Sequence, residues 1–310
     1  MRPLPPRTPA SIAARWVPAV LLTVAVLAVP AQAAAWGHDA HQFIMDRAIA
    51  LLPDTIRPFF EKHRAALTER AVDPDTWRTM GFVDEPPNHF VDLDWEGYGP
   101  YPFKELPRDY TAAVAKFGKV KILENGTLPW RVEEYFGSLR RAFEAYAARP
   151  NRGTGFDIVL LSAAMCHYVG DAHQPFHAVI SYDGQATNQR GIHARFESEL
   201  FDRFRPRLAF APAPMKPIAN PRDFIFDTLM EGTKLTPPIL AADLKALGPR
   251  DVYDDAYFEA LLAGSKSILE RRISESIAAT AAMLTGAWEA AGKPAAPATP
   301  PAQPPQRKRR

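Results

Sequence analysis

Two segments of the sequence place a histidine and a carboxylate at the spacing of one helical turn. His167 and Asp171 are four residues apart, as are His193 and Glu197, so each pair shares one face of a helix. A lone pair of this kind is usually a surface hydrogen bond. Residues 156–168, however, are apolar nearly all round, and a carboxylate buried at the end of such a helix is costly unless it is paired or bound to a metal. The two pairs therefore predict a helical metal site.

The chain after the first pair adds a further nitrogen donor and no thiolate. Pro175 ends the apolar helix, which allows His177 to approach the first pair from the next turn of chain. The role of His173 stays open between orienting a ligand and lying exposed. Cys166 is the only cysteine, so an intrachain disulfide is excluded. Nitrogen and oxygen donors without thiolate suit zinc with positions left open for water and substrate.

The spacing H-x3-D-x5-H followed by H-x3-E resembles bacterial zinc-dependent phospholipase C and its relatives, the single-strand-specific zinc nucleases. Mature chains of that family begin with a tryptophan followed shortly by a ligand histidine, which Trp36 and His41 match. The family also has an aspartate about fourteen residues before the histidine of an H-F-x-D stretch, which Asp75 and His89 match. Asp73 is the alternative to Asp75. The matching positions run in family order over more than half of the chain.

This resemblance implies three zinc ions per chain and a hydrolase acting on phosphoric diesters. The implied ligands of the first zinc are Asp75, His89, His167 and Asp171, and those of the second are His177, His193 and Glu197. The third would be held by the α-amine and carbonyl of Trp36, by His41 and by the other oxygen of Asp171. Two metals roughly 3.5–4 Å apart clamp a phosphate and lower the pKa of a bridging water toward about 7. Asp75 and Arg78 are the expected catalytic residues, with Arg78 on the phosphate.

The substrate is expected to be a phospholipid, and single-stranded nucleic acid is the alternative. Glu197 and the short interval from His177 to His193 favour the phospholipases, since the nucleases usually have Asp at the position of Glu197. Choline-specific relatives have an acid at the fourth mature position, matched by Asp39, but aromatic residues where this chain has Thr76 and Pro86.

The nuclease alternative rests on other residues. The stretch from Asp75 to Arg78 resembles the D-x-x-R of that branch, as does the spacing from Trp36 to His41. Phe90 and Asp92 could stack on a base and bond to it, although both recur in both branches. A second alternative is a zinc-binding protein without catalytic activity.

Helices are expected to position all of these side chains. A helical stripe of Ile44, Ala48, Leu51 and Leu52 follows Asp39, which is a candidate N-cap. Helical patterns recur over residues 132–148 and 256–289, and the apolar residues 156–168 between them predict a buried helix. Alternating strand patterns are scarce. We therefore expect an all-α fold, a single domain of roughly eight to ten helices over residues 36–292, of the zinc phospholipase C and zinc nuclease type.

The two ends of the sequence differ from this body. Residues 1–35 combine three arginines with an apolar run of 14 residues and an AQAAA stretch, which predicts a signal peptide cleaved after Ala33 or Ala35. The protein is thus expected to be exported, periplasmic or secreted. Residues 293–310 are rich in Pro and Ala with a basic end, which predicts a disordered tail. The body between carries 29 cations and 35 acids, a net charge of −6, which argues against tight duplex binding. No stable protein partner is expected.

Overall fold

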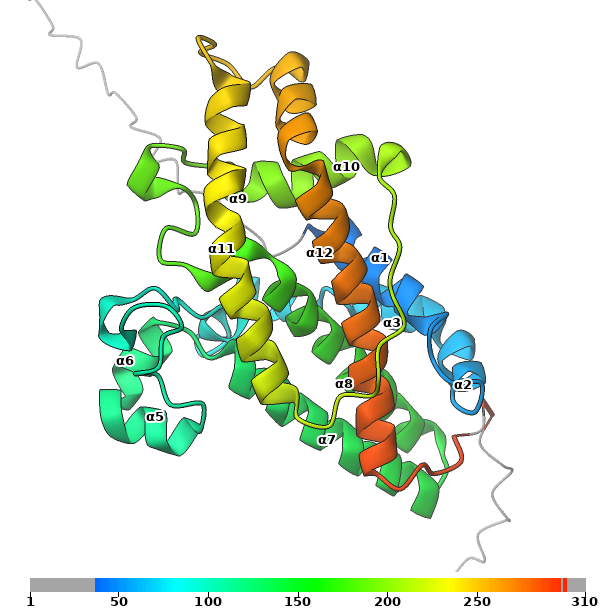
Figure 1. The fold of residues 1–310 in the computed structure, drawn as a ribbon. Coiled ribbons are helices and arrows are strands. Elements are labelled where there is room, and N and C mark those ends of the chain that lie inside the picture. Colours follow the sequence, from blue (N-terminus) through cyan, green and yellow to red (C-terminus); the bar gives the residue numbers. More distant parts are fainter. Residues whose placement is uncertain (1–36, 297, 300–310) are drawn as a thin grey trace, which may run out of the picture. The chain divides into compact units, whose positions relative to one another are not determined.

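Helix α8, which spans Arg152–His173, lies at the centre of the described chain with other helices packed around it (Figure 1). It begins with a capping box in which the Asn151 side chain accepts from the backbone of Gly153 and Thr154. It ends where Gln174 adopts extended backbone angles before Pro175, as the proline predicts. Its residues from Ser162 to His173 are all buried, so its C-terminal half carries His167 and Asp171 into the core.

This computed structural model describes residues 37–296, 298 and 299. The predicted leader, Trp36 and the end of the tail lie outside the described residues. The α-helices are α1 (His38–Ile49), α2 (Arg57–Lys62), α3 (Arg64–Arg70), α4 (Asp73–Thr79), α5 (Tyr110–Phe117), α6 (Lys119–Glu124), α7 (Leu128–Ala148), α8, α9 (Ile192–Ala194), α10 (Leu200–Phe204), α11 (Pro221–Leu247) and α12 (Asp255–Ala290). Short turns of 3-10 helix are η1 (Pro86–His89), η2 (Glu96–Tyr98), η3 (Pro175–Ala178), η4 (Gln185–Thr187) and η6 (Arg205–Arg207), and η5 (Arg195–Glu199) is a π-helical turn.

The all-α prediction is confirmed, since the described residues form helices and no strand. Ten of the α-helices have six or more residues, which agrees with the expected eight to ten. Helix α7 packs along α8, and α11 and α12 run side by side across them (Figure 1). Helix α1 packs against α3, α8 and α12. The site residues therefore come together at the point where α1, α4 and the turns after α8 meet the C-terminal half of α8.

A buried arginine of α12 fixes the C-terminal end of α8. The guanidinium of Arg272 donates to the carbonyl oxygens of His173 at 2.8 Å and of Ala172 at 3.3 Å, and it also pairs with Glu275 at 2.8 Å. The last carbonyls of a helix lack partners within the helix, and a cation at that end is favourable. Arg272 thereby supplies hydrogen-bond donors to the last two carbonyl groups of α8, which follow Asp171 directly.

One detail differs from the expectations. The N-cap of α1 is Gly37, without a side-chain cap, and Asp39 lies inside the first turn, so the N-cap prediction for Asp39 is wrong. At the other end Ala296 is 5% exposed, and the indole of Trp288 donates to the carbonyl of Pro294. Among the described residues no helix is both long enough and apolar enough to cross a bilayer.

Candidate metal centre

Three groups of buried histidines and carboxylates lie in the core at distances suited to holding metal ions. Within each group one ligand atom per residue lies within 4.8 Å of the others. The groups are His41, His167 and Asp171; Asp75, His89 and His167; and His177, His193 and Glu197. All eight residues are at most 5% exposed. The resemblance to zinc-dependent phospholipase C implies the same eight residues as zinc ligands, with Trp36 as the ninth.

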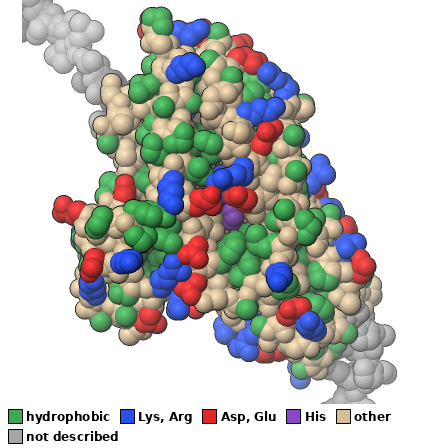
Figure 2. Space-filling view, viewed as in Figure 1, with side chains coloured by type: hydrophobic (Ala, Val, Ile, Leu, Met, Phe, Trp, Pro, Cys, Tyr) green, Lys and Arg blue, Asp and Glu red, His purple; other side chains and the backbone are tan. Residues whose placement is uncertain are grey.

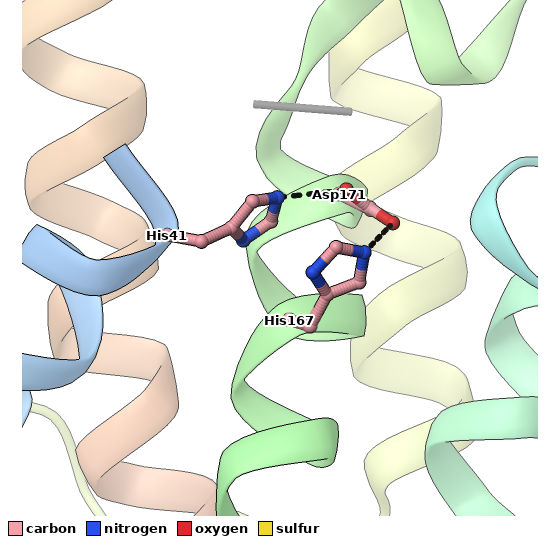
Figure 3. A group of neighbouring side chains, drawn as sticks. All are labelled: His41, His167 and Asp171. Atoms are coloured by element: carbon pink, nitrogen blue, oxygen red, sulfur yellow. Dashed lines mark ion pairs between the residues drawn. The ribbon is translucent and has the colours of Figure 1, made fainter. Parts of the chain in front are cut away.

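The first group joins α1 to α8 (Figure 3). Nε2 of His41 lies 3.4 Å from Oδ1 of Asp171, and the rings of His41 and His167 stack with their centroids 4.0 Å apart. Gly170 makes this approach possible, because a Cβ there would lie 2.8 Å from Nδ1 of His41. Because Gly170 has no side chain, α1 can pack close enough to α8 for His41 to lie beside Asp171.

Asp171 links this group to the second one. Its Oδ2 lies 2.9 Å from Nδ1 of His89 and 3.3 Å from Nε2 of His167, whereas Oδ1 faces His41. Oδ1 of Asp75 lies 4.0 Å from both of these histidine nitrogens. The two oxygens of one carboxylate thus point at different groups, which is the arrangement of a bridging ligand.

The third group is built by the turns that follow α8. Nε2 of His193 lies 3.2 Å from Nε2 of His177 and 2.9 Å from Oε2 of Glu197. Nδ1 of His177 donates to the carbonyl of His89 at 2.6 Å, and Nδ1 of His193 donates to the carbonyl of Tyr182 at 3.0 Å. These backbone bonds fix the protons on Nδ1 and turn the Nε2 atoms toward each other.

This orientation is what a cation requires. Two neutral imidazoles that both donate through Nδ1 direct lone pairs at one another from their Nε2 atoms, which is unfavourable unless a proton or a metal lies between them. Within the described chain, seven buried atoms of the groups also lack a hydrogen bond: both ring nitrogens of His41, both oxygens of Asp75, Nε2 of His89, Oδ1 of Asp171 and Oε1 of Glu197. Oδ1 of Asp75 has an ion pair with Arg78, and Nε2 of His41 has one with Asp171. Buried atoms that lack hydrogen bonds are costly, so the residues fit bound metal ions.

The pKa values of the groups are strongly perturbed. Burial lowers the pKa of His41 to about 4 and that of His177 to about 3. Burial acts in the same direction on His89, but the bond to Asp171 and the nearby Glu85 outweigh it and raise its pKa to about 9. Burial raises the pKa of Glu197. A metal ion would replace the protons that these neighbouring groups must otherwise share.

Two residues that the sequence analysis did not identify contact the candidate metal ligands. Oε1 of Glu85 lies 3.6 Å from Nε2 of His89, and Glu85 also accepts from the hydroxyl of Tyr168 and pairs with Arg131 at 3.3 Å. Nε2 of Gln174 donates to Oε2 of Glu197 at 2.9 Å. Carboxylates and amides in such positions fix the rings and raise ligand basicity. The four-residue spacing of Glu85 and His89 was the available signal for the first.

The remaining candidate residues lie around the groups. Arg78 is next to Asp75, with Nη2 3.2 Å from Oδ1. Asp73 instead pairs with Arg70 at 2.9 Å, so Asp75 is the aspartate that the fold brings to the histidines. His173 is buried, bonds to the carbonyl of Val169 and belongs to none of the groups.

The three expected substrate-binding residues differ in position. Phe90 and Asp92 follow His89 directly and are half-buried, and burial together with the charge of Asp94 raises the pKa of Asp92 to about 7. Asp39 is exposed and lines a separate cavity of about 380 Å³ with Arg47 and Arg205. The structure therefore keeps Phe90 and Asp92 near the groups and places Asp39 outside them.

Four of the eight residues are slightly exposed. The side chains of Asp75, His89, His177 and His193 keep 2–5% exposure, whereas His41, His167, Asp171 and Glu197 have none. On the face drawn in Figure 2 a histidine is visible between charged side chains, with hydrophobic patches on both sides. A substrate would thus meet the exposed edge of the groups while the other ligand candidates stay in the core.

Fold and site define an all-helical protein with a buried multi-histidine centre suited to metal ions. The family model described as zinc dependent phospholipase C matches residues 40–243, and the chain belongs to this family. The matched range contains all eight residues of the three groups. A search of curated proteins found no match. Family and site together indicate a zinc-dependent hydrolase of phosphodiester bonds.

Proposed function

We propose that this protein is an exported phosphodiesterase that holds three zinc ions and cleaves phospholipids in the manner of a phospholipase C. The observation that carries the proposal is that Asp171 directs its two carboxylate oxygens at two different histidine groups. A single structural metal would not need a carboxylate shared in this way. Adjoining metal positions are what phosphodiester hydrolysis uses.

The ligand sets follow the groups. Asp75, His89, His167 and Asp171 would hold one zinc, and His177, His193 and Glu197 another. His41 would hold the third with Asp171, and the α-amine and carbonyl of Trp36 would complete it after cleavage behind Ala35. An amide nitrogen is a poor ligand because its lone pair is delocalised, whereas a free α-amine binds once deprotonated.

The chain's own residues bind and orient the diester at the exposed edge of the groups. Bound zinc would supply an activated water and a positive field for the phosphate. Arg78, held beside Asp75, would contact a phosphate oxygen through its guanidinium. The backbone bonds of His177 and His193 and the contact of Gln174 with Glu197 keep these side chains fixed, so little reorganisation is needed when substrate arrives.

Single-stranded nucleic acid is the second candidate substrate. It is favoured by the pairing of Asp75 with Arg78, by the spacing of Trp36 and His41, and by Phe90 and Asp92 beside the groups. Family membership supports phospholipid, as do Glu197 and the short interval between His177 and His193. A binding protein without turnover is the remaining alternative.

One experiment separates the three. The zinc-loaded protein is incubated side by side with phosphatidylcholine, phosphatidylethanolamine, single-stranded DNA and bis(p-nitrophenyl) phosphate. We expect hydrolysis of the lipids and of the small diester, and an EDTA-treated sample serves as the control. Faster hydrolysis of DNA than of either lipid would favour the nuclease, and bound zinc without any turnover would reject the enzyme.

A further inference from the structure

One arginine lies between the two ligand candidates that come from the turns after η3. Arg195 is two residues after His193 and two residues before Glu197. It is nonetheless buried, with its side chain 8% exposed. Removing a cation from water is costly unless the cation is paired and hydrogen-bonded, so the partners of Arg195 decide what it does in this position.

The turn that carries Arg195 directs it away from the metal group. Residues four apart share one side of a helical turn, whereas residues two apart lie on opposite sides. His193 and Glu197 accordingly meet at 2.9 Å. Arg195 instead contacts Asp243 near the end of α11 and Tyr257 in the first turn of α12.

Four hydrogen bonds hold the guanidinium of Arg195 in one orientation. Nε donates to the hydroxyl of Tyr257 at 2.8 Å, and Nη2 donates to Oδ1 of Asp243 at 3.0 Å. Nη1 donates to the carbonyl of Arg190 at 2.8 Å, and Nη2 donates to that of Gln189 at 3.3 Å. The planar fork of arginine loses little freedom in making several such bonds at once. One side chain thus ties the loop before α9 to both α11 and α12.

The partners of Arg195 are fixed in turn. Asp243 is 1% exposed, and its Oδ2 accepts from Nε2 of Gln189 at 2.7 Å while its Oδ1 accepts from the hydroxyl of Tyr257. Gly191 has φ +84°, and a Cβ there would lie 2.8 Å from Nη1 of Arg195, so glycine suits both the backbone angle and the close approach. We name the following set of side chains the arginine clamp: Arg195, Asp243, Tyr257 and Gln189.

Stability alone does not account for a buried ion pair of this kind. Removing two charges from water is costly, and apolar residues of similar volume in their place are often neutral or stabilising. A polar network in which the groups are satisfied does impose one rigid arrangement. Arg195 begins the π-helical turn Arg195–Glu199, and such turns are rare and frequent at functional sites. The pairing of Arg195 with Asp243 is therefore explained by the orientation that it imposes on this turn.

We propose that the arginine clamp positions His193 and Glu197 for one metal ion, with Arg195 as a positioning residue and not a ligand. The proposal rests on the proposed function only in taking His177, His193 and Glu197 as a zinc position. Rotation of the turn about its axis would move both ligand side chains away from His177 together, and the clamp opposes this rotation. The bonds of the clamp described above reach no ligand candidate of the other two groups, so its loss should affect one zinc.

Zinc counts in a set of variants test this assignment. The clamp variant is Arg195→Met with Asp243→Leu, which removes both charges so that neither is left buried without its partner. Tyr257→Phe is a milder second variant that removes one hydroxyl and no charge. The matched control is Arg203→Met, because Arg203 pairs with Glu199 of the same turn at 2.8 Å but has a side chain that is 41% exposed.

Zinc per chain is measured by elemental analysis and affinity by chelator competition on the full chain, with melting temperatures of the metal-free forms. Glu197→Gln, alone and combined with the clamp variant, identifies the zinc that responds. We expect the clamp variant to bind one zinc about tenfold or more weakly and the others unchanged. Tyr257→Phe should weaken the same zinc by a smaller factor, and Arg203→Met should match the wild type. In the Glu197→Gln background the clamp variant should cost no further zinc.

Wild-type zinc affinity in both the clamp variant and Tyr257→Phe would overturn the proposal. So would an equal loss at all three positions, which a general structural role predicts, or further zinc loss when the clamp variant is added to Glu197→Gln. The wild-type rate on bis(p-nitrophenyl) phosphate is measured separately. Selective zinc loss without any wild-type turnover rejects the enzyme and supports the positioning role, whereas turnover with unaltered zinc in the variants rejects only the positioning role.

Discussion

Replacing Asp171 with asparagine tests whether this carboxylate is shared between two metal positions. The change keeps one oxygen and exchanges the other for an amide nitrogen, which does not bind zinc. Because Oδ1 faces His41 and Oδ2 faces His89 and His167, either orientation of the amide removes a ligand from one group and a negative charge from both. We therefore expect Asp171→Asn to lose more than one zinc per chain.

Glu197→Gln is the matched comparison. Glu197 is as buried as Asp171, and among the described residues it belongs only to the group with His177 and His193. The chemical change, carboxylate to amide, is the same. We expect this variant to lose at most one zinc.

The thermal effect can be worked out from linkage. At a free zinc concentration about 100 times the dissociation constant, each occupied site stabilises the folded state by about 2.7 kcal/mol. Loss of one site then lowers the melting temperature by about 5–10 °C and loss of two by about 10–20 °C, at roughly 2–4 °C per kcal/mol for a domain of this size.

Elemental analysis of zinc per chain is the primary assay, on protein dialysed against a fixed zinc buffer, with melting temperatures recorded in the same buffer. Asp73→Asn is the control, since Asp73 pairs with Arg70 outside the groups, and it should keep the wild-type zinc content. Equal zinc losses in Asp171→Asn and Glu197→Gln would refute the bridging assignment.

Three further predictions concern neighbouring residues. Glu85→Gln should weaken zinc binding by about 10–100-fold in a chelator competition, because the negative charge beside His89 is lost. Glu134→Gln leaves Glu85 charged and should not weaken it. The pKa of Asp92 is raised to about 7 by burial and by Asp94, so its ionised carboxylate destabilises the folded state increasingly from about pH 4 to pH 7. Asp92→Asn should therefore stabilise the metal-free protein by up to a few kcal/mol at about pH 8 and hardly at all at about pH 4. Equal stabilisation at both pH values would contradict this explanation. A chain starting at Trp36 should hold more zinc than one starting at Ala34, and identical zinc contents would reject the α-amine as a ligand.

Local spacing predicted the helical class and the two pairs of histidine and carboxylate, whereas His41, Asp75 and His89 were implied only by the resemblance to zinc-dependent phospholipase C. The separation of His167 and Asp171 is set by one helical turn, and Pro175 does end α8 directly after His173. Periodicity over residues 132–148 likewise predicts one apolar face of Tyr135, Leu139, Phe143 and Tyr146. In α7 the last three are at most 1% exposed and Tyr135 is partly buried.

What the sequence could not give were contacts between distant segments. Arg272 reaches the end of α8 from α12, and Tyr168 and Arg131 meet at Glu85 from α8 and α7; no spacing rule connects them. The N-cap of α1 was missed because Gly37 starts the helix by backbone geometry alone, without a side-chain bond.

The bond that is broken in a phospholipid tests the central claim most directly. Vesicles of phosphatidylcholine and phosphatidylethanolamine are incubated with the zinc-loaded protein, and the products are followed by phosphorus NMR and by lipid extraction. A phosphodiesterase of this family should release the phosphorylated headgroup as a monoester together with an equal amount of diacylglycerol, and EDTA should stop the release. Intact lipid in the presence of verified bound zinc, or phosphatidic acid with free headgroup alcohol, would contradict the assignment.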